Sequence, residues 1–138
     1  GGHPYEAGPF DELLAALGEW EITHLVHPEG GEADAADAIR AADALLLYDM
    51  AGYSFGEGTV TMRPPSPAFR EALAGRFAGG RGAVAMHHAL AGWAEWPEWH
   101  HWLGGQFHYQ PGAHGPDSGY RHDITYEARI LVDHPVTR

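Results

Sequence analysis

The clearest indication of the fold comes from residues 81–93, Arg81-Gly-Ala-Val-Ala-Met-His87-His88-Ala-Leu-Ala-Gly-Trp93. A short apolar run that ends in two histidines is typical of a buried parallel strand, which brings polar side chains to the carboxyl edge of a sheet. Ligands of open α/β sheets bind outside that edge, so we expect a site at His87 and His88. Adjacent residues of a strand point to opposite faces, so one histidine should line the cleft while the other packs beneath it. The alternative is that both are structural.

The rest of the chain alternates predicted strands and helices, which indicates a doubly wound α/β fold. Apolar runs and alternating patterns predict strands over residues 21–26, 44–48, 83–86 and 124–130. Caps and helical spacing predict helices over residues 10–17, 34–42, 67–78 and 96–103. Glycine-rich stretches at residues 52–58 and 106–119 are predicted loops. We therefore expect one domain with a three-layer, mostly parallel, flavodoxin-like sheet.

Composition excludes several classes of function. The 138 residues contain eight arginines, no lysine and nineteen acidic residues, which gives a formal net charge of −11. A surface this acidic disfavours binding to nucleic acids or to an anionic membrane. The chain has no cysteine, so disulfides, thiolate nucleophiles and zinc–thiolate sites are excluded. No apolar run is long enough to span a membrane and no signal peptide is visible, so we expect a cytoplasmic protein.

Further side chains are predicted to lie at the carboxyl edge of the sheet. Asp49 ends the strand 44–48 and is expected to orient a histidine, with the capping of a turn as its alternative role. Gly1-Gly2-His3 has the pattern of a strand exit, so we expect a strand ahead of Gly1 and His3 at the same edge. Trp93 is the candidate platform for ligand stacking, whereas helical spacing favours a core role for Trp96 and Trp99.

Other chemistries lack the residues that they need. The sequence contains no Walker loop, no Gly-x-Gly-x-x-Gly after a strand and no Gly-x-Ser-x-Gly elbow. Histidines are frequent between residues 100 and 122, but no His-Glu-x-x-His motif is present. We therefore expect neither a metal nor another cofactor.

Taken together, the motifs resemble the ThuA-like family of trehalose utilisation, whose fold is similar to that of class I glutamine amidotransferases. The resemblance covers almost the whole chain, and Trp93 and Trp96 belong to it. It rests mainly on Gly1-Gly2-His3, Tyr48-Asp49, Gly80–Leu90, Leu103-Gly-Gly-Gln-Phe107 and Asp133-His-Pro-Val-Thr137. Family members begin with a strand ahead of Gly1 and continue past residue 138. The chain thus resembles one ThuA-like domain over residues 1–138, incomplete at both ends.

The resemblance implies a role in disaccharide use, on keto-sugars made by a partner oxidoreductase. Amidotransferases have a cysteine where this chain has His87-His88, so glutamine hydrolysis through a thiolate is excluded. Histidine acid/base chemistry fits isomerisation, or elimination-type cleavage of a 3-keto-glycoside. The reason is that a neutral imidazole can remove the acidified proton beside the ketone.

This interpretation assigns roles to seven residues. We expect acid/base catalysis from three of them, His87, His88 and Asp49. We expect four more to bind the saccharide, namely His3, Trp93, Phe107 and His114. A non-catalytic sugar-binding or regulatory protein on the same scaffold is the alternative, because a fold does not imply a function. An open sheet edge would also favour a homo-oligomer.

Overall fold

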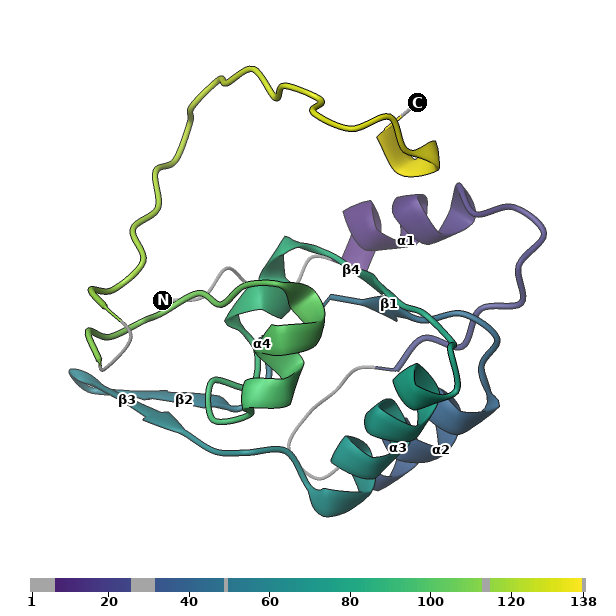
Figure 1. Ribbon diagram of the computed structural model, residues 1–138, viewed down its shortest axis with the longest axis horizontal. Helices are drawn as coiled ribbons and strands as arrows, with labels where there is room; N and C mark the ends of the chain where they lie inside the picture. The colour runs from purple at the N-terminus through teal and green to yellow at the C-terminus, as the bar shows by residue number, and fades with distance from the viewer. Residues whose placement is uncertain (1–6, 26–31, 49, 113–114, 138) are drawn as a thin grey trace.

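The computed structural model describes residues 7–25, 32–48, 50–112 and 115–137, and it confirms a mixed α/β protein (Figure 1). Helices are α1 (Ala7–Ala15), α2 (Glu32–Ala41), α3 (Pro67–Ala78) and α4 (Pro97–Leu103), with 3₁₀ helices η1 (His87–Ala91) and η2 (Pro135–Thr137). Strands are β1 (Leu46–Leu47), β2 (Tyr53–Gly56), β3 (Thr59–Met62) and β4 (Val84–Ala85). Each of the two sheets has two strands, β1–β4 and β2–β3.

The parallel pair β1–β4 is the element that positions the candidate site. Leu46 is in register with Val84, and Leu47 with Ala85, as expected for parallel neighbours. Leu47 packs against the hydrophobic core, but Leu46 and Val84 are 37% and 64% exposed. The prediction that the strand before His87 is buried is therefore wrong, and its neighbour β1 is also partly exposed. A parallel strand is buried on both faces only where a second layer covers it, and here only one face meets the core.

An antiparallel hairpin replaces the loop predicted over residues 52–58. β2 and β3 pair with Tyr53 opposite Met62 and Phe55 opposite Val60. The two strands are joined at Glu57-Gly58, where Gly58 has a φ of 74°, a conformation that glycine adopts without strain. Apolar residues alternate with polar ones on both sides of this turn, a hairpin pattern that the glycine content concealed.

α3 forms where the sequence predicts a helix, because its ends are encoded locally. The Ser66 hydroxyl accepts a hydrogen bond from the Phe69 backbone N–H at 3.3 Å, and Pro67 occupies the first turn. Phe69 and Leu73 are buried as predicted from their spacing, and the helix ends before Gly79.

The hydrophobic core lies between α2, α3 and α4. Trp93, Trp96 and Trp99 are at most 2% exposed and, with Leu73 of α3, are its largest fully buried side chains; Ile39 of α2 belongs to the same cluster. The core role predicted for Trp96 and Trp99 is confirmed. The Trp99 indole N–H donates to the Ala89 carbonyl at 2.9 Å, which satisfies its one polar atom and joins α4 to η1.

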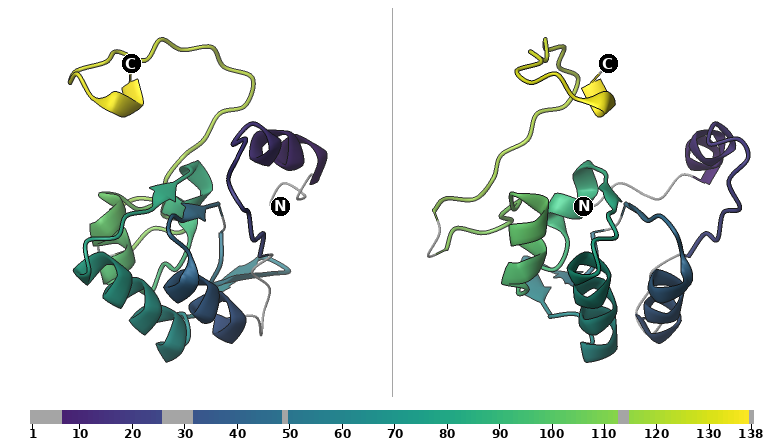
Figure 2. Two further views of the ribbon diagram at one scale, coloured as in Figure 1. Left: turned by 90° about the vertical axis from the view of Figure 1, so that its right-hand side faces the viewer. Right: turned by 45° about the vertical axis from the view of Figure 1, so that its right-hand side comes forward.

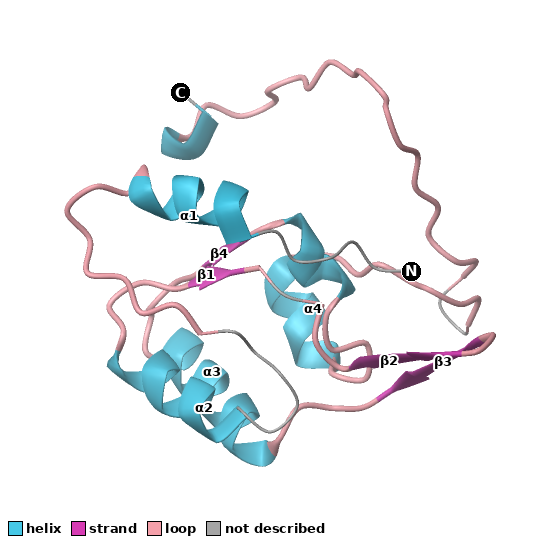
Figure 3. Ribbon diagram, turned by 180° about the vertical axis from the view of Figure 1, so that it is seen from behind, coloured by secondary structure: helices cyan, strands magenta, loops and turns pink. Residues whose placement is uncertain are grey.

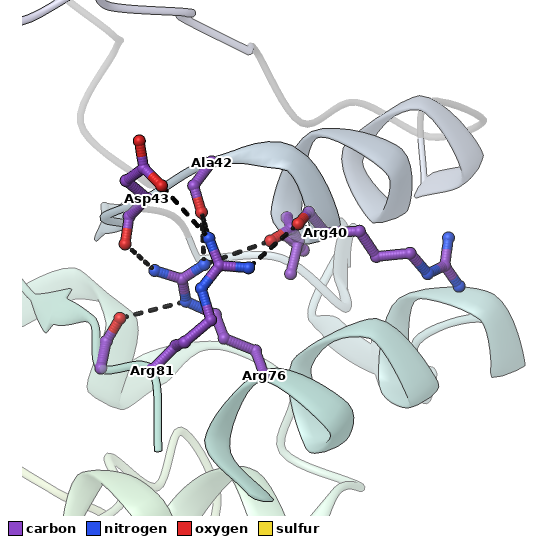
Figure 4. A network of polar contacts seen from close by, with 7 residues as sticks. Arg40, Ala42, Asp43, Arg76 and Arg81 are labelled. Carbon is purple, nitrogen blue, oxygen red and sulfur yellow. Dashed lines mark hydrogen bonds and ion pairs between the residues drawn. The ribbon is translucent and has the colours of Figure 1, made fainter. Parts of the chain in front are cut away.

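A buried arginine on α3 closes the carboxyl end of α2. Arg76 is 4% exposed and donates hydrogen bonds to the carbonyls of Ile39, Ala42 and Asp43 at 2.8–3.3 Å (Figure 4). Arg81 donates to the Ala42 carbonyl as well. The last carbonyls of a helix have no partner inside it, so these guanidinium groups satisfy them and oppose the negative end of the helix dipole.

The two ends of the described chain lie outside this core. α1 begins and ends slightly earlier than predicted, and none of its residues is buried. Residues 21–25 and 124–130 have no regular secondary structure, so the strands predicted there are not formed in the described residues. Alternating sequence alone does not make a strand, because a strand needs a neighbour to satisfy its backbone groups.

Figures 1 and 2 show residues 119–134, here called the C-terminal arm, leaving the body as a long arc.

Figure 3 shows the β1–β4 pair lying between α1 on one side and the α2–α3 pair on the other. In the described part of the chain, no helix has the length and apolar character needed to cross a membrane.

Candidate functional site

The two candidate catalytic histidines lie together at the start of η1. Their ring centroids are 4.1 Å apart with an interplanar angle of 53°, and His87 is exposed while His88 is half-buried. The prediction that they point to opposite faces is wrong, because they belong to a 3₁₀ turn and not to the strand. The strand ends at Ala85, and the turn that follows Met86 brings both imidazoles to one place.

Tyr48 is a site residue that the sequence interpretation did not select. Its ring stacks on His88 with a centroid distance of 5.0 Å and an angle of 13°, and it lies 5.7 Å from the His87 ring. Tyr48 directly follows β1 as His87 closely follows β4, and the two strands are parallel, so their carboxyl ends lie side by side. Tyr48 could have been predicted from the sequence, because it is the last residue of the apolar run 44–48 and directly precedes Asp49.

An aromatic ladder connects this histidine pair to α1. Phe10 of α1 stacks on Tyr48 at 5.6 Å and 14°, so that Phe10, Tyr48 and His88 follow one another. His24 lies 5.2 Å from Phe10, measured between ring centroids. α1 has no buried residue, so these ring contacts contribute much of its packing against the rest of the protein. Three of the five rings are imidazoles, those of His24, His87 and His88.

Three predicted site residues, Asp49, His3 and His114, lie outside the described residues. Their roles as catalytic or saccharide-binding groups stay predictions.

Trp93 occupies a different environment from the one expected of a ligand platform. It is fully buried, its ring lies 5.4 Å from Phe69, and the Arg63 guanidinium lies over the ring at 5.4 Å. Its φ of 49° is rare for a residue with a large side chain and holds the indole inward. Gly52 packs so closely that a Cβ there would lie 2.8 Å from the indole. Stacking of a ligand on Trp93 would thus require Arg63 or Phe69 to move.

Phe107 lies in an aromatic cluster beside the β2–β3 hairpin. Its backbone N–H donates to the Leu90 carbonyl at 2.8 Å, which fixes it next to η1. Its ring contacts Tyr109 at 4.9 Å, and Tyr109 contacts Tyr53 at the same distance. Burial, with a smaller contribution from Tyr109, raises the pKa of Tyr53 to about 12. The Tyr53 hydroxyl stays protonated and, among the described residues, has no hydrogen-bond partner.

His100 has an altered pKa, although it is not one of the predicted site residues. Its Nε2 lies 3.1 Å from the Trp93 carbonyl. Burial lowers the pKa of His100 below its ordinary value, against the opposing effect of its contacts with backbone carbonyls. Its Nδ1 is buried and has no partner among the described residues, so the neutral imidazole is the favoured form.

A shallow depression of about 190 Å³ lies on α3 and α4, away from the residues of η1. It is lined by Arg70, Glu71, Ala74, Trp96, Glu98 and Trp102. The Arg70 guanidinium lies 5.7 Å from the centre of the Trp96 ring and 4.0 Å from the Glu98 carboxylate. This volume is below the range of typical ligand pockets, so the depression has room for one ring or one side chain.

The described residues include no group of three or more His, Asp or Glu side chains placed to hold a metal ion. Comparison of the chain with models of protein families, with curated proteins and with solved structures finds no match.

Proposed function

We propose that this protein acts in carbohydrate metabolism and moves protons on a keto-disaccharide with His87 and His88. The observation that carries the proposal is the contact of the two imidazoles, whose ring centroids are 4.1 Å apart, with Tyr48 stacked on His88. One imidazole can accept a proton while its neighbour donates one, which is what acid/base catalysis needs from a pair. His87 is exposed, so a substrate can reach it.

The reaction proposed is elimination or isomerisation beside a ketone. In a 3-keto-glycoside, one histidine takes the proton from the carbon between the ketone and the anomeric carbon. The bond from the anomeric carbon to the glycosidic oxygen then breaks, and the other histidine protonates that oxygen as it leaves. Without bond cleavage, return of the proton to a different atom gives an isomer. The substrate class follows from the ThuA-like resemblance, which also proposes an oxidoreductase as the source of the keto-sugar.

The proposal extends the observed parallel pair to a larger sheet. β1 and β4 would be neighbouring strands of a doubly wound, three-layer, flavodoxin-like sheet, with its ligand at their carboxyl ends. Asp49 would orient a histidine, and His3, Phe107 and His114 would contact the saccharide. We propose a cytoplasmic protein that binds neither nucleic acid nor membrane and is able to form a homo-oligomer.

Turnover of a 3-keto-disaccharide tests the proposal. We expect His87→Ala and His88→Ala each to lower kcat by about 10²- to 10⁴-fold, the usual contribution of one acid/base group. Tyr48→Phe keeps the ring stack and should leave most activity. The matched control is His101→Ala, an exposed histidine on α4, which should leave the rate unchanged. Unchanged rates in both His87→Ala and His88→Ala would contradict the proposal.

A non-catalytic saccharide-binding protein is the second candidate. The observation in its favour is the depression on α3 and α4, where Trp102 and the polar groups of Arg70 and Glu98 offer a face for one sugar ring. Calorimetry with the same disaccharide separates the two candidates. Binding that Trp102→Ala abolishes and His88→Ala does not, with no turnover, would favour this second function.

A further inference from the structure

The C-terminal arm has the sequence of a strand but no partner strand. Ile124, Tyr126 and Ile130 are 56–77% exposed, and residues 124–130 alternate these apolar residues with Thr125, Glu127 and Arg129. In the described chain no strand pairs with residues 124–131. Extended apolar segments with free backbone groups readily add to the edge of a sheet.

β4 offers such an edge. The Val84 N–H donates to the Leu45 carbonyl and the Met86 N–H donates to the Leu47 carbonyl, both at 2.8 Å. Backbone groups alternate in direction along a strand, so the N–H and C=O of Ala85 point away from β1. No described strand occupies this outer edge. A two-stranded sheet with an exposed face is marginal alone and gains from a third strand.

Backbone hydrogen bonds connect the start of the arm to η1, the helix that follows β4. The Ser118 N–H donates to the His108 carbonyl at 2.7 Å, and the Phe107 N–H donates to the Leu90 carbonyl at 2.8 Å, so the arm begins beside η1. η1 separates Leu90 from Ala85 by about 10 Å at the rise of a 3₁₀ helix. Residues 119–123 can span about 17 Å, which exceeds the length of η1. Asp123 has a φ of 52° and turns the chain at the point where the alternating segment begins.

We infer that residues 124–131 add to the outer edge of β4 as an antiparallel strand of the same chain, and that Arg121, His122 and Asp123 are thereby brought to the His87–His88 end of β4. An arm that starts beside η1 and runs back along β4 is antiparallel to it. The residues just before the new strand then lie where β4 ends. The apolar side of the arm joins the face of Leu47 and Ala85, and the polar side joins the exposed face of Val84.

The closed arm deepens the proposed function, on which this part of the inference rests. In the structure His87 is exposed and His88 is half-buried. The closed arm would cover the pair and add a cation, an imidazole and a carboxylate. Exclusion of water and a fixed charge beside the histidines both favour proton transfer. Arg121, His122 and Asp123 would then be positioning or substrate-binding residues.

Hydrogen exchange at single backbone amides tests strand addition without any saccharide. The Val84 amide should be protected whether or not the arm is docked, because it is bonded within β1–β4. The Ala85 amide should be protected only when the arm is docked, and slowed by about tenfold or more. Ala128→Pro removes a ladder N–H and should return Ala85 to rapid exchange with Val84 unchanged. The matched control Ala128→Ser keeps the N–H and should keep the protection.

Two results would overturn the inference. One is rapid exchange of Ala85 in the unaltered chain, and the other is protection that Ala128→Pro does not change.

Introduced cysteines give a second measurement, because the chain has none of its own. Val84→Cys combined in turn with cysteine at residues 125, 127 and 129 should form a disulfide within one monomer in at least one register. Disulfides that form only between chains would show that the arm docks on a second copy instead. None of these measurements depends on turnover, so they test the docking of the arm independently of the proposed function.

Discussion

The body formed by α2, α3, α4 and η1 differs from α1 and the C-terminal arm in what surrounds its apolar residues. Both regions carry apolar residues at regular spacing. In the body Leu73 and Trp99 are at most 1% exposed, whereas Ile130 in the arm is 62% exposed and α1 buries nothing. Periodicity therefore specifies which face of an element is apolar, while burial of that face depends on a neighbour distant in sequence.

The largest expected effect on stability is the loss of a core tryptophan. Trp99→Ala leaves a cavity between α4 and η1 and removes the hydrogen bond to the Ala89 carbonyl, so it should lower the free energy of unfolding by about 3–5 kcal/mol. The matched change Trp20→Ala, at a side chain 62% exposed, should have an effect within about 0.5 kcal/mol. Urea denaturation of both variants checks this, and equal losses would mean that residues 19–25 are packed in solution.

The next effect concerns two glycines that both have positive φ. At Gly52, φ 87°, a Cβ would lie 2.8 Å from the Trp93 ring and 2.9 Å from the Arg63 carbonyl oxygen. Gly52→Ala should therefore cost about 2–4 kcal/mol, from backbone strain and overpacking together. At Gly58, φ 74°, nothing lies within 4 Å, so Gly58→Ala should cost about 1 kcal/mol, from strain alone. A melting temperature that falls equally in both would argue against the close packing of Gly52 on Trp93.

Arg76 should matter more than its neighbour Arg81. Arg76→Met keeps much of the side-chain volume but leaves carbonyls at the end of α2 without donors, which should cost about 2 kcal/mol. Arg81 is 40% exposed and its ion pair with Asp43 is 3.7 Å long, so Arg81→Met should cost less, about 1 kcal/mol or below. Chemical denaturation that ranks the two in the opposite order would show that Arg81 is the main cap.

The smallest effect is a change in the pH dependence of stability. Burial lowers the pKa of His100 in the folded protein below its ordinary value of 6.5. The unfolded chain therefore binds this proton first, and stability should fall as the pH drops below about 6.5, until His100 is protonated in the fold as well. His100→Gln should reduce this slope, whereas His101→Gln, at the exposed neighbour, should not. Denaturation midpoints between pH 7.5 and 5.5 measure both slopes, and identical slopes would contradict the assignment.

The sequence predicted best the elements whose boundaries are set locally. α3 needs only Ser66, Pro67 and Gly79 to define its ends, and α4 ends at Gly104, whose φ is 73°. The parallel pairing of two apolar runs was also predictable. The β2–β3 hairpin was missed, because the alternation around Gly58 is short and lies in a stretch dominated by glycine. The lengths and exposure of β1 and β4 were not predictable, since they depend on which layers cover them.

The candidate site was predicted in part. The position of His87 and His88 just beyond β4 follows from the end of the apolar run, but their mutual contact depends on the 3₁₀ turn, which the sequence did not indicate. The same reasoning could have selected Tyr48, which ends the neighbouring apolar run. The stack of Phe10 on Tyr48 was not, because it joins residues 38 positions apart through an orientation of α1 that no local pattern encodes.

The burial of Arg76 also determines how a protease would cut this protein. Trypsin cleaves after lysine and arginine, and the chain has no lysine. Arg76 is buried against the end of α2, while Arg121 and Arg129 lie on the exposed arm. Brief digestion should therefore cut the undocked arm first and leave a fragment that ends near residue 121, with the histidine pair intact, whereas an arm paired with β4 should resist this cleavage.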